Sequence, residues 1–108
     1  MSEWVRVASV QDVPDDEPFQ VKAGGELISL VRYEGQIYAV SDICTHEYTH
    51  LSDGFVDGPC IECPLHGAMF DVRTGEVKAL PATRPLPTFA VRVEGDDVHV
   101  QITGDDNS

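Results

Sequence analysis

Two short segments of this chain each bring one cysteine and one histidine together. The first contains Cys44 and His46, and the second, after a gap of sixteen residues, contains Cys63 and His66. Structural zinc sites more often use paired cysteines or a closely spaced pair of histidines. Two thiolates and two imidazoles are instead the ligand set of a [2Fe–2S] cluster in which histidines replace two of the cysteines. The spacing therefore predicts a binuclear iron–sulfur centre held by two loops.

The two segments resemble the signature of the Rieske proteins, which is Cys-x-His followed, after a similar gap, by Cys-x-x-His. The similarity covers most of the chain, roughly residues 4–102, and it extends to the small Rieske-type ferredoxins of bacterial ring-hydroxylating oxygenase systems. In the Rieske pattern, Cys44 and Cys63 hold one iron, while His46 and His66 hold the other. The resemblance therefore implies one Rieske-type [2Fe–2S] cluster as the cofactor, with these four residues as its ligands.

The neighbours of the ligands imply a reduction potential in the lower part of the Rieske range. High-potential Rieske proteins carry an extra cysteine in each loop, where this chain has Thr49 and Leu65. They also place a serine and a tyrosine beside the cluster sulfurs, where this chain has Ala68 and Phe70. Because fewer donors stabilise the added electron, we expect a value near the low end of about −150 to +300 mV. Such a potential suits an electron that originates on NADH.

Other residues of the two loops are expected to shape the site. Gly54 and Gly67 are expected to allow close backbone approach or a positive φ angle. The proline-rich segment 79–87 resembles the loop that covers the cluster in Rieske proteins. It would stiffen the site and limit its contact with solvent.

The elements that must position these ligands are short β-strands. Alternating apolar residues or β-rich composition indicate strands over residues 4–8, 19–21, 27–33, 36–40, 89–93 and 98–102, and no stretch has a long helical period. We expect an all-β fold: a Rieske-like antiparallel β-sandwich base with an inserted cluster-binding subdomain at about residues 42–85. Residues 1–103 would form a single domain, and residues 104–108 a flexible acidic tail.

Composition excludes several classes of function. Nineteen acidic residues against seven basic ones give a formal charge of −12, which argues against nucleic acid or an anionic membrane as the partner. We expect neither a signal peptide nor a membrane span. Three cysteines are too few for a disulfide scaffold, which favours the cytoplasm. Seven acids between residues 42 and 83, against Arg73 and Lys78, are expected to steer the cluster end toward basic patches on redox partners.

The expected function is that of an electron carrier rather than an enzyme. The resemblance implies a ferredoxin that takes one electron at a time from an NAD(P)H-dependent flavin reductase. It would pass the electron to a terminal Rieske non-haem iron dioxygenase that acts on aromatic or related hydrophobic compounds. Once His46 and His66 are assigned, only His50 and His99 remain, too few for a mononuclear oxygenase iron site on so short a chain. Both partners would bind transiently, and the carrier is expected to be a monomer.

Two alternatives remain open from the sequence. One is the small Rieske-like subunit of an assimilatory nitrite reductase. The other is a zinc-stabilised interaction module, in which Cys44, Cys60, Cys63 and His66 would form a tetrahedral set. The zinc set would leave His46 without a role. Cys60 is interpreted as a small buried hydrophobe in a strand rather than as half of a redox-active pair with Cys63.

The remaining histidine and aromatic residues are not expected to bind the cofactor. We interpret His50 as a solvated loop residue and His99 as an inert residue on the polar face of the last strand. Four aromatic residues are assigned to the core rather than to a cofactor platform: Trp4, Tyr33, Tyr38 and Phe89.

Overall fold

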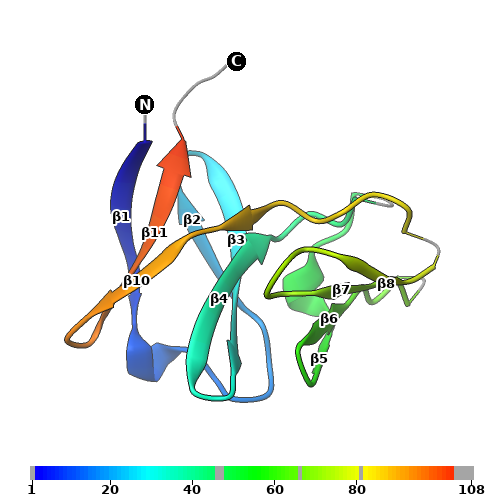
Figure 1. The fold of residues 1–108 in the computed structure, drawn as a ribbon, viewed down its shortest axis with the longest axis horizontal. Helices are drawn as coiled ribbons and strands as arrows, with labels where there is room; N and C mark the ends of the chain where they lie inside the picture. The colour runs from blue at the N-terminus through cyan, green and yellow to red at the C-terminus, as the bar shows by residue number, and fades with distance from the viewer. Residues whose placement is uncertain (1, 46–47, 66, 81, 104–108) are drawn as a thin grey trace.

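The structure, a computed structural model, describes residues 2–45, 48–65, 67–80 and 82–103. Over these residues the chain forms three antiparallel sheets and two short 3-10 helices, which confirms the predicted all-β class (Figure 1). The first sheet has the order β1-β11-β10: Ser2–Ser9, Asp97–Thr103, Val91–Glu94. The second has the order β2-β3-β4-β9: Phe19–Ala23, Glu26–Tyr33, Gln36–Ser41, Thr88–Phe89. The third has the order β5-β6-β7-β8: Phe55–Asp57, Cys60–Glu62, Met69–Asp71, Val77–Ala79. The helices are η1 (Val10–Asp12) and η2 (Leu51–Asp53).

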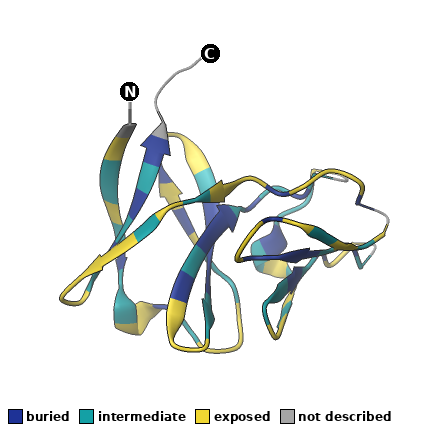
Figure 2. Ribbon diagram, viewed as in Figure 1, coloured by how far each residue is buried: buried dark blue, intermediate teal, exposed yellow. Residues whose placement is uncertain are grey.

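The second sheet is covered on both faces, because its strands alternate between two hydrophobic cores. Ile28 and Leu30 of β3 face the first core, which lies against the β1-β11-β10 sheet. Val31 and Val40 point the other way, into a second core beneath the third sheet. Successive side chains of a strand point to opposite faces, so one short run of apolar residues serves both cores. Figure 2 shows the buried residues of both cores in dark blue.

The second core joins the base to the stretch that carries the cysteine pairs. Its fully buried members include Leu51 from η2, Ile61 from β6 and Phe70 from β7. Cys44 and Cys63 belong to the same core. The third sheet is therefore packed on the base through the residues that surround the predicted ligands. The predicted tail, residues 104–108, lies outside the described residues.

The strand predicted over residues 89–93 is interrupted in the structure. β9 pairs with β4 of the second sheet, whereas β10 pairs with β11 of the first. The chain passes from one sheet to the other at Ala90, whose carbonyl accepts a hydrogen bond from the Gln101 amide at 3.0 Å. An alternating pattern reports which side chains are buried and not which neighbouring strand is paired, so the sequence did not reveal this change of sheet.

Two of the four aromatic residues assigned to the core lie elsewhere. Phe89 packs against the first core and Tyr38 against the second, as predicted. Trp4 lies on the outer face of the first sheet, where the guanidinium carbon of Arg92 is 4.5 Å from its ring centroid. The corresponding carbon of Arg73 lies 5.5 Å from the centroid of Tyr33. These two rings act as platforms for arginine side chains rather than as core residues.

Candidate metal centre

The two predicted cysteine ligands each begin a loop that is closed in the same way. The Cys44 amide donates to the Thr49 carbonyl at 3.0 Å, and the Cys63 amide donates to the Ala68 carbonyl at 2.7 Å. Each loop therefore spans four residues between its closing pair, residues 45–48 and 64–67. The predicted histidine ligands His46 and His66 belong to these loops but lie outside the described residues. The two loops thus have the same length, and each begins at a cysteine.

The environment of the two cysteines fits a centre that binds through sulfur. Cys44 is 4 % exposed and Cys63 is 2 % exposed, and both lie in the second core. All three cysteines fall within the described ranges, and none of them is in a disulfide. Soft thiolate ligands at the edge of an apolar core suit an iron–sulfur group, whose potential depends on burial and on hydrogen bonds to sulfur. The two cysteines therefore fit a [2Fe–2S] cluster.

The first loop is fixed at its base by Asp42, one of the seven acids that were expected to steer redox partners. The Asp42 side chain is fully buried, and its Oδ1 accepts hydrogen bonds from Ser29 Oγ at 2.6 Å and the Ser52 amide at 2.7 Å. Its Oδ2 accepts hydrogen bonds from Gln20 Nε2 at 2.7 Å and Ser52 Oγ at 3.1 Å. The Asp42 backbone also pairs with Leu27 and Leu51. Asp42 thus ties the start and the end of the loop to strands β2 and β3.

The proline-rich segment is tied to the same loop. Thr45 Oγ1 donates to the Arg84 carbonyl at 2.8 Å, and Arg84 Nη2 donates in return to the Thr45 carbonyl at 3.0 Å. At its far end, the Leu86 amide donates to the Gly75 carbonyl at 2.7 Å, and the Pro87 carbonyl accepts from the Ser41 amide at 2.9 Å. The segment therefore runs from β8 past the first loop and back to the base. That it covers the cluster stays a prediction.

The two glycines of the ligand region behave as expected. Gly67 has a φ angle of +78°, a conformation in which a side chain is strained. A Cβ atom on Gly54 would overlap the Glu62 carbonyl oxygen, so the backbones of η2 and β6 approach closely there. The two glycines thus serve different purposes, one conformational and the other steric.

Cys60 lies in β6 and is half-buried rather than buried as expected. Burial raises the pKa of its thiol, and the negative charges of Asp71 and Asp57 raise it further. Across the described ranges, which include all three cysteines, no three metal-ligating side chains come together. The zinc set of Cys44, Cys60, Cys63 and His66 thus receives no support from its three cysteines.

The other two histidines have ordinary neighbours. His50 Nδ1 lies 3.5 Å from Gln20 Nε2 and 3.9 Å from Asp42 Oδ2, and its ring centroid is 5.8 Å from that of Tyr48. His50 is thus half-exposed beside the Asp42 network rather than simply solvated. His99 lies in β11, where its ladder partners are Arg6 of β1 and Arg92 of β10. Its Nδ1 atom is buried and has no hydrogen-bond partner within the described ranges.

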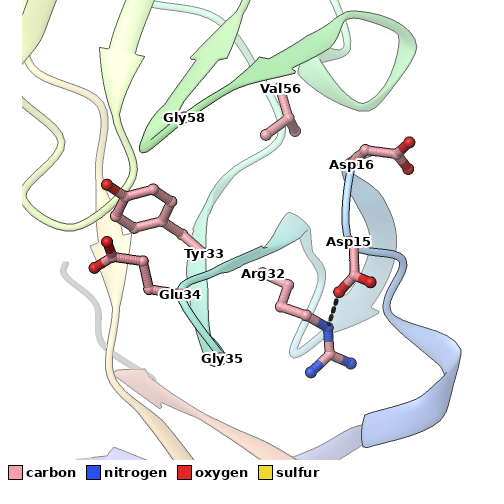
Figure 3. A pocket seen from close by; sticks show the side chains of 8 residues that line it. All are labelled: Asp15, Asp16, Arg32, Tyr33, Glu34, Gly35, Val56 and Gly58. Atoms are coloured by element: carbon pink, nitrogen blue, oxygen red, sulfur yellow. Dashed lines mark ion pairs between the residues drawn. The ribbon is translucent and has the colours of Figure 1, made fainter.

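An open depression of about 290 Å³ lies between the base and the β5–β6 hairpin (Figure 3). Its lining includes Asp15, Asp16, Glu34 and Arg32, and none of the described cysteines and histidines lies in it. Arg32 pairs with Asp15 at 3.2 Å and donates to the Val10 carbonyl at 2.6 Å. The depression is a polar junction between the two halves of the molecule and is separate from the cysteine loops.

Comparisons with known proteins identify the family of the chain. The family described as "Rieske [2Fe-2S] domain" matches residues 3–90. The ferredoxin component of the naphthalene 1,2-dioxygenase/salicylate 5-hydroxylase systems of Ralstonia sp. is 42 % identical over 91 residues, which are 84 % of this chain and 88 % of that protein. That relative is named as a ferredoxin, an electron-transfer component, and not as a catalytic one.

Solved structures show the same fold. The ferredoxin of Sphingomonas yanoikuyae B1 superposes with a TM-score of 0.89 at 33 % identity, covering 94 % of this chain and all of that one. A ferredoxin solved in complex with the reduced oxygenase of carbazole 1,9a-dioxygenase has a TM-score of 0.83 at 37 % identity, covering 89 % of this chain and 99 % of that one. Within the described ranges, no helix is long and apolar enough to cross a membrane. The chain therefore belongs to the Rieske [2Fe–2S] family, as a ferredoxin-type member that carries one Rieske-type cluster.

Proposed function

We propose that this chain is the ferredoxin of a multicomponent dioxygenase system that acts on aromatic or related hydrophobic compounds. It takes single electrons from an NAD(P)H-dependent flavin reductase and delivers them to a terminal Rieske non-haem iron oxygenase. The observation that carries this proposal is the match to named ferredoxin components along nearly the full length of both proteins. Neither the nitrite reductase subunit nor the zinc module is favoured by these relatives.

We propose that Cys44 and Cys63 bind one iron and that His46 and His66 bind the other. When bound, the cluster supplies a site that accepts and releases one electron. The chain contributes two buried thiols on loops of equal length. It also contributes Ala68 and Phe70, which are both fully buried and have no side-chain donor to offer a sulfur atom. Their side chains support a potential in the lower part of the Rieske range.

The partners are proposed to meet the end of the molecule that carries the cysteine loops. Three large apolar side chains are exposed on these loops and the adjoining proline-rich segment: Tyr48, Leu65 and Leu80. A related ferredoxin has been solved in complex with its oxygenase, which supports an oxygenase as one partner. The flavoprotein reductase, transient binding to both partners, the monomeric state and a cytoplasmic location belong to the same proposal, as does a single domain over residues 1–103. Neither nucleic acid nor a membrane is proposed as a partner.

The first test is the content of the purified protein. Iron and acid-labile sulfide at two atoms of each per chain, with a low average g value in the EPR spectrum of the reduced state, are expected. A colourless protein with one bound zinc would contradict the proposal. Reconstitution with a reductase and an oxygenase should then restore NADH-dependent product formation only when this protein is present.

Two cysteine variants form a matched pair for the ligand assignment. Cys63→Ala is expected to abolish the cluster, because it removes one of the two buried thiolates. Cys60→Ala, three residues away in β6, should keep the cluster and its EPR signal. Loss of bound metal in Cys60→Ala, with retention in His46→Ala, would favour zinc instead.

A further inference from the structure

Asp42 is a fully buried carboxylate that the proposed ligand set does not use. It lies two residues before Cys44, at the point where β4 passes into the first ligand loop. Its two oxygens accept hydrogen bonds from Ser29, Ser52 and Gln20, at distances between 2.6 and 3.1 Å. Each oxygen accepts a hydrogen bond from an N–H group, Oδ1 from the Ser52 amide and Oδ2 from Gln20 Nε2, as carboxylates do.

The Asp42 carboxylate has no lysine or arginine in ion-pair contact within the described residues. Across the described ranges, which include every lysine and arginine, the one ion-pair contact of Asp42 is with His50 Nδ1 at 3.9 Å. The other buried acid, Asp71, is instead paired with Arg73 at 2.8 Å. Dipoles of hydroxyl and amide groups therefore stabilise the charge of Asp42, and no lysine or arginine pairs with it.

A buried charge acts strongly on a nearby electron, because the protein interior screens it less than water does. Reduction adds one negative charge to the cluster, which a neighbouring carboxylate opposes. We propose that Asp42 is a positioning residue for the first ligand loop and that its buried charge lowers the reduction potential of the cluster. This inference rests on the proposed function, and in particular on Cys44 as a ligand.

Asparagine can replace Asp42 with little change in shape. Its side-chain oxygen would keep the Oδ1 position and accept from Ser29 Oγ and the Ser52 amide. Its amide nitrogen would take the Oδ2 position, where the Ser52 hydroxyl can accept and the Gln20 amide can rotate to present its oxygen. The substitution thus removes the charge and retains the network.

The experiment is a redox titration of the cluster-loaded protein, followed by circular dichroism or EPR at low and high ionic strength. Asp42→Asn is expected to raise the equilibrium constant for reduction about tenfold, which is about 59 mV for one electron. The shift should persist at high salt, because salt screens buried charges poorly. The control is Asp53→Asn, an exposed acid at the end of the same loop region, whose smaller shift should vanish at high salt.

A second variant, Ser29→Ala, is expected to change the reduction potential in the opposite direction. Ser29→Ala removes one donor and leaves the charge in place, so the potential is expected to fall. If Asp42→Asn and Ser29→Ala only disturbed the structure, there would be no reason for them to shift the reduction potential in opposite directions. This variant also provides the test if Asp42→Asn does not retain its cluster.

Failure of this inference can be told apart from failure of the proposed function. An unchanged potential in Asp42→Asn or in Ser29→Ala, with a wild-type EPR spectrum, would overturn the role of Asp42 alone. Equal shifts in Asp42→Asn and Asp53→Asn at both salt concentrations would also overturn it. Absence of iron and sulfide from the wild-type protein would instead remove the proposed function.

Discussion

Asp71 and Arg73 form a charged pair at the end of β7. Asp71 is 4 % exposed and accepts hydrogen bonds from the Arg73 amide at 2.9 Å, from Nε at 3.0 Å and from Nη2 at 2.8 Å. The side-chain hydrogen bonds from Arg73 lower the pKa of Asp71, although burial opposes them, and the pKa of Arg73 is raised in return. Because Arg73 also lies over Tyr33, the pair links the third sheet to the β3–β4 hairpin.

This pair predicts how stability depends on pH. Because the pKa of Asp71 is lower in the folded protein, its stabilisation is present above the unfolded value of about 3.9 and is lost as the pH falls through the folded value. The free-energy difference of unfolding between wild type and Asp71→Asn should therefore be about 1–3 kcal/mol at pH 7 and shrink below about pH 4. Urea unfolding at several pH values measures it. Glu94→Gln, which removes an exposed partner of Arg92, should give a small difference at every pH.

His66→Cys tests the histidine ligands through the electronic character of the cluster. A third thiolate adds negative charge to the centre, which makes reduction harder. The potential should fall by about 100 mV or more, toward the plant-type ferredoxins at roughly −400 mV. A redox titration of the cluster-bearing variant measures the change. An unchanged potential would mean that His66 is not an iron ligand, and His99→Cys, in β11 of the base, serves as the control with no shift expected.

At the scale of single residues, the sequence reveals the ligands but not what supports them. Cys44 and Cys63 could be identified because their spacing from histidines is a local pattern. The role of Asp42 could not be identified, because its partners Gln20, Ser29 and Ser52 are brought together only by the fold. An aspartate after a strand has the same sequence appearance whether it faces solvent or a buried network.

Among the connecting elements, the turn between β7 and β8 is restricted in both conformation and space. Gly75 has a φ angle of +82°, and its carbonyl accepts the hydrogen bond from Leu86 that holds the proline-rich segment. A Cβ atom at this position would overlap the Leu86 carbonyl oxygen. The turn therefore positions the segment by direct backbone contact.

Gly75→Ala should loosen the proline-rich segment and speed the loss of the cluster. Backbone strain alone is expected to cost about 1 kcal/mol, and the overlap with Leu86 adds to it. The decay of visible absorbance in the presence of an iron chelator measures this loss. Gly58→Ala is the matched control, since its φ angle is +59° but a Cβ atom there would meet nothing within 4 Å. Equal decay rates in the two variants would show that strain, and not contact with the segment, determines retention.

The elements that could be predicted are those specified by neighbouring residues. The hairpin at Glu34 and Gly35 has φ angles of +51° and +79°, as a tight turn between two strands requires. β8 was not predicted, because Val77–Ala79 is short and its pairing with β7 depends on the turn at Gly75. The break at Ala90 likewise depends on two sheets that are distant in sequence.

On the scale of the whole molecule, the end that carries the cysteine loops exposes less acidic charge than the sequence suggests. Of the seven acids between residues 42 and 83, Asp42 and Asp71 are buried. Glu76 pairs with Lys78 at 3.2 Å. The exposed acids of this stretch within the described ranges include Asp53 and Asp57. Steering toward basic partners would therefore depend on few side chains.

The rate of electron transfer to or from a basic partner should fall as ionic strength rises, because salt screens exposed charges. Asp53→Asn should flatten this dependence, since Asp53 lies in η2 directly after the first ligand loop. Asp96→Asn, in the exposed turn between β10 and β11, is the control and should leave the dependence unchanged. Stopped-flow rates at several salt concentrations provide the measurement. A flat profile in the wild-type protein would contradict electrostatic steering.

The two ends of the described chain lie together, since Ser2 and Thr103 are partners in the β1–β11 ladder (Figure 1). The cysteine loops lie at the opposite side of the molecule, beyond the second sheet. A protein immobilised on a solid support through either end would therefore present its redox end to the surrounding solution. Such an arrangement would exchange electrons readily with dissolved proteins and slowly with the support beneath it.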